Sequence, residues 1–420
     1  MTLHVAVIGA GIVGVASAIE LLRDGHRVTL IEPGDPGGEQ AASYGNGTLL
    51  NPSSVIPMSS PGLWKKVPGY LTDPLGPLAI RWRYLPKLWP WLTRFVRAGA
   101  TPERVGATAR ALAPLVADAP GLHRRLAEEA GVADLITRQG VLFVFPDRAA
   151  FEAEGLSWRL RRENGTKWLE LDEDELRQRE PSLDRRYKFA VLVEENGQCR
   201  DPGSLVAALA RHAVGQGAAL RRARATGLRI EGGRLRAVLT EDGEIACDRV
   251  VIAAGARSAM FAAAAGDWVP LETERGYHAV IRDPGVEPRY PMMPSDGKMA
   301  FAMTPAGLRI AGQVELAGLE AAPNWKRAEV LLKFARTAYP GLPADVGPER
   351  VKVWMGHRPS TPDGLPCLGL ASGCRDVVYA FGHGHVGLTA GPRTGIVVAD
   401  LVAGRVPSLD LAAFSAGRFK

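Results

Sequence analysis

The first 32 residues constrain the fold more than any other part of the chain. The apolar, β-branched run Val5 to Ile8 is followed at once by the glycine-rich turn GAGIVG at residues 9–14 and by a helix-like stretch. A second apolar run, Val28 to Ile31, ends at Glu32. This order of strand, turn, helix, strand and acid predicts a β-α-β unit that binds a dinucleotide at its first turn.

Each position of this unit has its own physical role. Gly9 permits the tight turn, Gly11 lets the pyrophosphate approach the backbone, and Gly14 lets the helix pack close to the sheet. The first N–H groups of the helix and its positive dipole end face the phosphates, and Glu32 binds the ribose hydroxyls. The alternative, a glycine-rich turn in an ordinary α/β domain, leaves Glu32 unexplained. The predicted cofactor residues here are Gly9, Gly11, Ile12, Val13, Gly14 and Glu32.

The length and composition are ordinary for a globular protein with two domains. The chain has 420 residues, of which 46% are hydrophobic and 23% are charged. No apolar run approaches the roughly 20 residues that span a bilayer, and no basic region precedes the first apolar run, so we expect a cytoplasmic protein. The four cysteines form no CxxC pair and have no histidine partners at zinc spacing, so we expect reduced thiols and no metal site.

The net charge of +6 resides in one segment, residues 62–97, which we call the basic segment. It holds seven cations, one acid and four of the nine tryptophans. Such a mixture favours peripheral contact with an anionic surface such as the inner membrane, although five prolines exclude one long helix. The alternative is a lid or subunit contact that buries the tryptophans. The tryptophans are Trp64, Trp82, Trp89 and Trp91, and the cations are Lys65, Lys66, Arg81, Arg83, Lys87, Arg94 and Arg97.

Two further stretches have the small residues that a close-lying cofactor requires. A long Gly/Ser/Pro-rich segment follows Glu32, and its part at 42–47 is placed to run past the cofactor, with a plain surface loop as the alternative. The strand predicted at 248–255 ends in a small-residue turn, where a ligand can lie across the carboxyl edge of a parallel sheet. The predicted cofactor contacts are Ser43, Gly45, Asn46, Gly47, Ala254 and Gly255.

The last third of the chain returns to the dinucleotide pattern. Residues 272–281 and 299–316 predict strands of a second sheet, with a hairpin turn at 305–307. A strand at 377–381 then leads into the glycine-rich turn GHGHVG and a helix at 394–402. A second glycine-rich turn suggests a ligand that reaches well beyond the first β-α-β unit, which favours FAD over NAD.

The chain resembles the D-amino acid oxidase and dehydrogenase (DAO) family of flavoproteins, most closely its bacterial D-amino acid dehydrogenase branch. The resemblance lies in VAVIGAGIVG (5–14), ASYGNGTLLNPSS (42–54), VVIAAGARS (250–258), WMGHRPSTPDGLPCLG (354–369) and AFGHGHVGLTAGPRTGIVVADLVAG (380–404). It implies an α/β fold with α+β elements. A Rossmann-type FAD-binding domain of the glutathione-reductase-like kind would comprise 1–58, 196–266 and 351–420, and a substrate domain with an antiparallel sheet would comprise 59–195 and 267–350.

The resemblance also implies roles in the substrate site. Arg358, the arginine of the GxRP motif, would hold the substrate carboxylate through two charge-assisted hydrogen bonds, with a structural ion pair as the alternative. Tyr277 and His278 begin the strand that should cross the flavin, so they would line the pocket unless they pack elsewhere. Members with covalently attached flavin use a cysteine at the place of Gly356, so we expect non-covalent FAD.

The C-terminal glycine-rich turn is implied to lie against the pyrimidine end of the flavin. Its backbone N–H groups and the start of the next helix could stabilise the negative charge that develops there on reduction. His383 is a candidate catalytic residue that need not titrate for this role, and a role as base for His383 or His385 is the alternative. The flavin contacts expected here are Gly384, His385, Val386, Gly387 and Leu388.

Together these features predict an FAD-dependent amino acid dehydrogenase. The substrate, expected to be a D-amino acid, would give its Cα hydrogen to flavin N5 as hydride, and the imine would hydrolyse to a 2-oxo acid. Electrons would pass to quinone or another acceptor. The alternatives are an O2-using oxidase of secondary amino acids, imino acids or opines, and the flavin subunit of a hetero-oligomeric amine dehydrogenase with a partner subunit. Confinement of the charge to the basic segment argues against nucleic acid as a partner.

Overall fold

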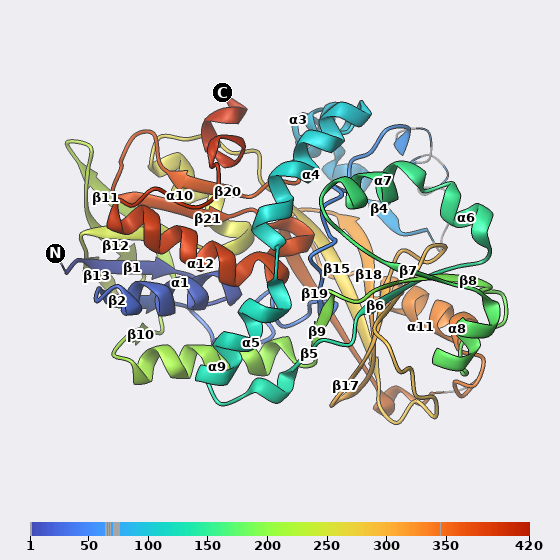
Figure 1. Ribbon diagram of the computed structural model, residues 1–420. Helices are drawn as coiled ribbons and strands as arrows, with labels where there is room; N and C mark the ends of the chain where they lie inside the picture. Colours follow the sequence, from blue (N-terminus) through green and yellow to red (C-terminus); the bar gives the residue numbers. More distant parts are fainter. Residues whose placement is uncertain (1, 64, 66, 68, 70–75, 345) are drawn as a thin grey trace.

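The computed structural model contains two large sheets that lie side by side, and it describes residues 2–63, 65, 67, 69, 76–344 and 346–420. Figure 1 shows the sheet of the N-terminal strand on the left and the second sheet on the right, each flanked by helices. Of the tryptophans and charged residues of the basic segment, Trp64, Lys66 and Asp73 lie outside the described residues.

The first sheet is the predicted Rossmann-type sheet. Its strand order is β10-β2-β1-β14-β21-β20, and all neighbours are parallel except β20 and β21. The carboxyl ends of β1, β14 and β21 therefore meet at one edge, as the glycine-rich turns after them predicted. The strands are β1 (His4–Ile8), β2 (Arg27–Ile31), β10 (Ala219–Arg221), β14 (Arg249–Ile252), β20 (Cys367–Leu370) and β21 (Val377–Phe381).

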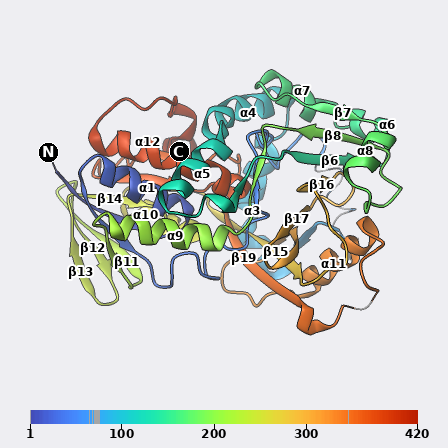
Figure 2. The same cartoon turned by 60° about the horizontal axis from the view of Figure 1, so that its bottom comes forward.

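The strands of this sheet alternate between two cores because both faces are covered. Val5 and Val7 face the helical layer, whereas Ala6 and Ile8 face a small antiparallel sheet and α10. In the helical layer, α4 and α5 lie beside α12, as Figures 1 and 2 show. The helices are α1 (Ile12–Arg23), α4 (Pro102–Val116), α5 (Ala119–Glu129), α9 (Pro202–Gly215), α10 (Ser258–Ala264) and α12 (Gly387–Ala403), and the small sheet is β11 (Ala225–Glu231), β12 (Arg234–Thr240) and β13 (Gly243–Ala246).

The second sheet has nine strands in the order β19-β15-β18-β17-β16-β6-β8-β7, with β4 beside β18. Most neighbours are antiparallel, and the predicted hairpin joins β17 to β18. Helices α8 (Glu173–Arg179) and α11 (Lys326–Ala338) share a core with one face of this sheet. The strands are β4 (Leu78–Ile80), β6 (Val141–Phe145), β7 (Leu169–Leu171), β8 (Phe189–Val193), β15 (Glu272–Ile281), β16 (Met292–Pro294), β17 (Ala300–Thr304), β18 (Gly307–Leu316) and β19 (Val351–Ser360).

Short elements connect the two sheets. A three-stranded sheet pairs the segment after Glu32 with chain from the middle of the sequence, in the order β3-β9-β5. The remaining elements are β3 (Leu49–Leu50), β5 (Ile136–Thr137), β9 (Gly197–Cys199), α3 (Leu85–Ala98), α6 (Arg148–Glu152), α7 (Gly155–Glu163) and the 3-10 helices η1 (Trp82–Tyr84), η2 (Ala133–Leu135), η3 (Gly255–Arg257), η4 (Pro348–Arg350), η5 (Gly384–Val386), η6 (Ala412–Phe414) and η7 (Ala416–Phe419).

The structure differs from two expectations drawn from the sequence. β19 was placed in the FAD-binding part 351–420, but it pairs with β15 and belongs to the second sheet. α4 and α5 were placed with the substrate domain, but they contribute to the core of the Rossmann-type sheet. Among the described residues, one helical stretch, Gly384–Ala403, is long and apolar enough by length and composition to cross a membrane, but 67% of it is buried inside the protein.

Candidate active site

The turn after β1 has the geometry that a dinucleotide pyrophosphate requires. Gly9 has a φ of +100°, and a Cβ there would lie 2.4 Å from the carbonyl oxygen of Ala253. A Cβ on Gly14 would lie 1.8 Å from the Gly9 carbonyl oxygen, so only glycine allows this approach of helix to strand. Gly11 is the N-cap of α1 and has no side chain to cap the helix, which leaves room for phosphate at the helix start.

Two side chains brace this turn. Glu32, at the end of β2, accepts a hydrogen bond from the Ala10 N–H through Oε2 (2.9 Å). Ser43 Oγ accepts one from the Ile12 N–H (3.1 Å). Glu32 also lines the cavity described next, so its carboxylate can reach a ribose there. The turn, the carboxylate and the helix start therefore fit the adenosine diphosphate half of FAD.

A cavity of about 1480 Å³ extends from this turn to the second sheet. Of the predicted cofactor residues, Gly14 alone does not line it, in keeping with its packing role. The others are Gly9, Gly11, Ile12, Val13, Glu32, Ser43, Gly45, Asn46, Gly47, Ala254, Gly255, Gly384, His385, Val386, Gly387 and Leu388. The structure thus brings three distant parts of the chain to a single cavity.

His383 and η5 form the wall of the cavity at the start of α12. Gly384 has a φ of +50°, and η5 leads directly into α12. The His383 Nε2 lies 3.0 Å from Thr394 Oγ, and burial lowers the pKa of His383 to about 3. His383 is therefore neutral at pH 7.

Arg358 lies in the cavity and is held by the strands beneath it. Its guanidinium crosses Gly276 of β15, where a Cβ would lie 2.2 Å from the Arg358 Cζ. Nη1 donates to the Gln313 carbonyl (2.9 Å) and Nη2 to the Gly312 carbonyl (3.4 Å). Each of these bonds uses one N–H of one Nη. The second N–H of each Nη is left for a ligand, and two such donors can bind a carboxylate.

The carbonyl that anchors Arg358 comes from an irregular residue. Gln313 has a φ of +61°, unusual for a residue with a side chain, and lies where the pairing of β15 with β18 shifts register. The bulge turns the Gln313 carbonyl toward Arg358. No sequence signal identified Gln313, because a bulge depends on pairing that the local sequence does not reveal.

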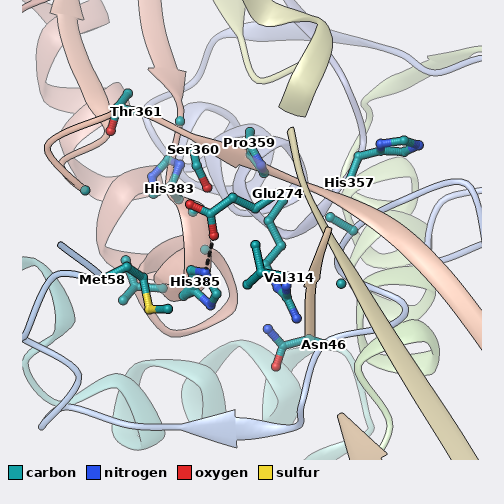
Figure 3. Close-up of a pocket in the computed structure, with 18 of the residues that line it drawn as sticks. Asn46, Met58, Glu274, Val314, His357, Pro359, Ser360, Thr361, His383 and His385 are labelled. Carbon is teal, nitrogen blue, oxygen red and sulfur yellow. Dashed lines mark hydrogen bonds and ion pairs between the residues drawn. The ribbon is translucent and has the colours of Figure 1, made fainter. Parts of the chain in front are cut away.

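Glu274 was not predicted, yet it lies next to Arg358. The two residues are directly opposite each other in the β15–β19 pair. Glu274 Oε2 accepts a hydrogen bond from His385 Nε2 (2.5 Å), as the dashed line in Figure 3 shows. Burial alone would raise the pKa of Glu274, but His385 and Arg358 together hold that pKa below its usual value. Glu274 is therefore negatively charged at neutral pH.

Tyr277 and His278 do not line the cavity, contrary to the sequence prediction. The Tyr277 hydroxyl donates to Glu315 Oε2 (2.5 Å) and accepts the Asn324 N–H (2.9 Å), away from the cavity. His278 is covered by the indole of Trp354, with ring centroids 5.1 Å apart. Glu274 and Gly276 are the β15 residues that face the cavity.

Trp354 fills space that two missing side chains leave. A Cβ on Gly45 would lie 1.8 Å from the indole, and one on Gly356 would lie 1.9 Å from it. Its Nε1 donates to the Glu39 carbonyl (2.9 Å), and its ring stacks on His278. The sequence explains the glycine at position 45 by the close approach of the cofactor. The structure adds a second reason, because any side chain there would overlap the Trp354 indole.

The described part of the basic segment forms the mouth of the cavity. Trp91 and Phe95 of α3 stack with centroids 4.9 Å apart and line the cavity. Trp82 and Trp89 are 68% and 58% exposed. The three described tryptophans of this segment therefore divide between the two alternatives, because Trp91 belongs to the cavity wall and Trp82 and Trp89 lie at the surface.

Within the described residues, the structure shows four unpaired, buried cysteines and no group of three metal-ligating side chains. Burial raises the pKa of Cys199, Cys247 and Cys367. These thiols are therefore protonated at neutral pH.

Comparisons with known proteins agree with this geometry. Residues 4–401 match the family model DAO, described as FAD dependent oxidoreductase. The chain is 61% identical over 416 residues to a D-amino-acid oxidase of Bradyrhizobium diazoefficiens, and 30% identical over 424 residues to a D-amino acid dehydrogenase of Paramagnetospirillum magneticum; both alignments cover 99% of each chain.

Solved structures of the same fold include two amino acid oxidoreductases. Glycine oxidase from Geobacillus kaustophilus has a TM-score of 0.73 at 25% identity, covering 99% of this chain and 98% of that one. L-proline dehydrogenase from P. horikoshii has a TM-score of 0.75 at 21% identity, covering 100% and 98%. With the dinucleotide turn and the cavity described above, these matches show that the chain belongs to the DAO family and is an FAD-dependent amino acid oxidoreductase.

Proposed function

We propose that this protein oxidises the Cα–N bond of D-amino acids. The observation that carries the proposal is Arg358, which lines the cavity that begins at the dinucleotide turn and keeps N–H groups that its two backbone hydrogen bonds do not use. The 61% identity to a D-amino-acid oxidase supports the D configuration. A bidentate arginine grips a carboxylate more specifically than a lysine does, so it selects acids and fixes their orientation.

FAD, held by the residues that line the cavity from Gly9 to Leu388, would supply the acceptor for the Cα hydride. The imine product then hydrolyses in water to a 2-oxo acid. The task of the protein is orientation, because holding the reacting atoms in line can contribute about 7–11 kcal/mol. The N–H groups of η5 and of the start of α12 favour negative charge nearby. Gly356 offers no thiol for attachment, so FAD binds non-covalently.

We assign O2 as the electron acceptor, on the name of the D-amino-acid oxidase relative. A second candidate is quinone at a membrane surface, because Trp82 and Trp89 are exposed near the cavity mouth among the cations of the basic segment. Identity to the dehydrogenase is about half of that to the oxidase, which favours O2.

Anaerobic bleaching of the yellow holoenzyme tests the substrate and the acceptor in one experiment. D-Amino acids should bleach the flavin, while L-amino acids, imino acids and opines should not. Air should then restore the colour faster than a soluble quinone does. Faster recovery with quinone would indicate a dehydrogenase and not an oxidase. If no compound bleaches it, a flavin subunit that needs a partner becomes the better explanation.

Arg358→Ala tests the carboxylate contact. Truncating one member of a desolvated charge pair costs about 2–5 kcal/mol, so kcat/KM should fall about 30-fold to several thousand-fold while FAD content stays unchanged. Arg336→Ala, an exposed arginine on α11, is the matched control and should keep full activity. Near-normal kcat/KM in Arg358→Ala, measured by steady-state kinetics, would refute the assignment.

A further inference from the structure

We propose that Glu274 is the residue that binds the substrate amine, so that Glu274 and Arg358 together recognise the two charged groups of an amino acid. The inference rests on the proposed function, which assigns the carboxylate to Arg358. It adds a specificity-determining residue that selects amino acids over carboxylic acids without an amine.

The first support is the position of the two residues. Glu274 and Arg358 face each other across the β15–β19 pair, and directly opposed residues of an antiparallel pair project from the same face. Both side chains line the cavity. Opposite charges on adjacent strands of one cavity wall match an amino acid, whose amine and carboxylate are attached to the same carbon.

The second support is that the two charges do not neutralise each other by direct contact. Among the described residues, Glu274 forms an ion pair with His385 and none with Arg358, which donates to two backbone carbonyls instead. A carboxylate whose role was to balance Arg358 would be expected to touch it. A ligand with both groups could bridge the two side chains.

The third support is the unused hydrogen-bonding capacity of Glu274. A carboxylate offers about four acceptor positions; His385 occupies one of them on Oε2, and the Ser360 hydroxyl, which helps to lower the pKa of Glu274, can occupy a second. Glu274 is only 5% exposed, so its remaining lone pairs reach few water molecules. Leaving a buried charge short of partners is costly, and an amine N–H supplies the missing donor. Figure 3 shows the Glu274 carboxylate between Ser360 and His385, with Met58 nearby.

The test compares two ligands that differ in the amine. 2-Aminoisobutyrate has no Cα hydrogen and cannot be oxidised, whereas isobutyrate has the same carbon skeleton and carboxylate but no amine. Each is titrated anaerobically into holoenzyme, and Kd is read from the flavin spectrum and by calorimetry. Glu274→Gln should raise the Kd for 2-aminoisobutyrate about 30-fold or more. The Kd for isobutyrate should stay the same or fall, because a negative neighbour has been removed.

Glu272→Gln is the matched control. Glu272 lies two residues earlier on the same face of β15, is buried, accepts a hydrogen bond from the Tyr84 hydroxyl (2.9 Å) and does not line the cavity. This variant should keep both Kd values of the wild type. Retained FAD and an unchanged melting temperature show that each variant is folded.

Three results would overturn the inference. They are equal weakening of both ligands in Glu274→Gln, no change for either ligand, and wild-type protein that binds isobutyrate as tightly as 2-aminoisobutyrate. Failure of the proposed function is seen separately, because it appears as absence of bleaching by D-amino acids in the wild type. The amine contact can therefore fail while D-amino acid oxidation stands.

Discussion

Arg358 is positioned by backbone groups of β15 and β18. Gly276 supplies the bare backbone that the side chain crosses, and the carbonyls of Gly312 and Gln313 fix the two Nη atoms. Preorganisation of this kind lowers the entropy lost on binding, because the arginine is already ordered before a ligand arrives. The conformation of Gln313 and the absence of a side chain at 276 are thus part of the proposed carboxylate site.

Gly276→Ala should impair the enzyme without touching any reacting atom. The new Cβ would overlap the Arg358 guanidinium, which must move away from its two carbonyl partners. We expect KM to rise and kcat/KM to fall by at least tenfold, with FAD content unchanged. Gly215→Ala, in α9 with no atom within 4 Å of the new Cβ, should leave activity as it is. Unchanged kinetics in Gly276→Ala would show that Arg358 tolerates displacement.

The sequence placed Glu32 at the end of a local β-α-β motif, and the family resemblance pointed to Arg358; both residues line the cavity. The sequence did not identify Glu274, and it placed Tyr277 and His278 in the cavity instead. Every residue of β15 is buried, so the strand has no alternation of polar and apolar residues to show which side faces the ligand. Tyr277 projects from the opposite side of the strand to Glu274 and Gly276. His278 shares their side, but it lies opposite Trp354 in the β15–β19 pair and its ring is covered by that indole.

At the scale of elements, one side of α3 lines the cavity and the other side is exposed to solvent. Trp91 and Leu88 are buried, and the Trp91 Nε1 donates to the Ser360 carbonyl (3.1 Å), next to the cavity. Trp89, two residues earlier, projects to the outside with Lys87 and Arg94. The helix therefore connects the mouth of the cavity with a cationic, aromatic outer face.

Two alanine substitutions on α3 should change the free energy of unfolding by very different amounts. Trp91→Ala removes a buried indole and should lower the free energy of unfolding by about 3–5 kcal/mol. Trp89→Ala should change it by about 0.5 kcal/mol or less, because the side chain is 58% exposed. Urea unfolding of both variants checks the pair. Equal losses would mean that Trp89 is covered in solution, as in a subunit contact.

The elements of the Rossmann-type sheet were predictable, whereas the membership of β19 was not. β1, α1 and β2 are adjacent in sequence, and the glycine turn between them is a local signal. β19 follows the residues of α11 but pairs with β15, far back along the chain. Hydrophobic pattern predicts that a segment is a strand without indicating its partner, so the boundary at 351 was wrong.

At the scale of the whole molecule, burial of histidines couples stability to pH. Burial lowers the pKa of His123 to about 4 and the pKa values of His278 and His383 to about 3. The folded protein keeps these rings neutral, while the unfolded chain binds protons near pH 6.5. The unfolded state is therefore favoured as pH falls below about 6.5, down to the folded pKa values.

His123→Gln should reduce this sensitivity to acid. His123 is fully buried and contacts the Leu388 carbonyl through Nε2 (2.8 Å), which a glutamine amide can replace. One such histidine costs about 2 kcal/mol between pH 7.5 and pH 5. The variant should lose about that much less stability than the wild type over this interval, measured by chemical unfolding at both pH values. Parallel losses would show that His123 is protonated in the folded state.

The indole of Trp354 restricts which residues can occupy positions 45 and 356. It occupies the volumes that side chains at Gly45 and Gly356 would need, and it is held by the Glu39 carbonyl and by His278. A cysteine at 356, the residue that would anchor flavin covalently in the related enzymes, collides with the ring as long as Trp354 is present. Substitutions at 45 and 356 are therefore coupled to the residue at 354: a side chain at either glycine should be tolerated only where Trp354 is replaced by a smaller residue.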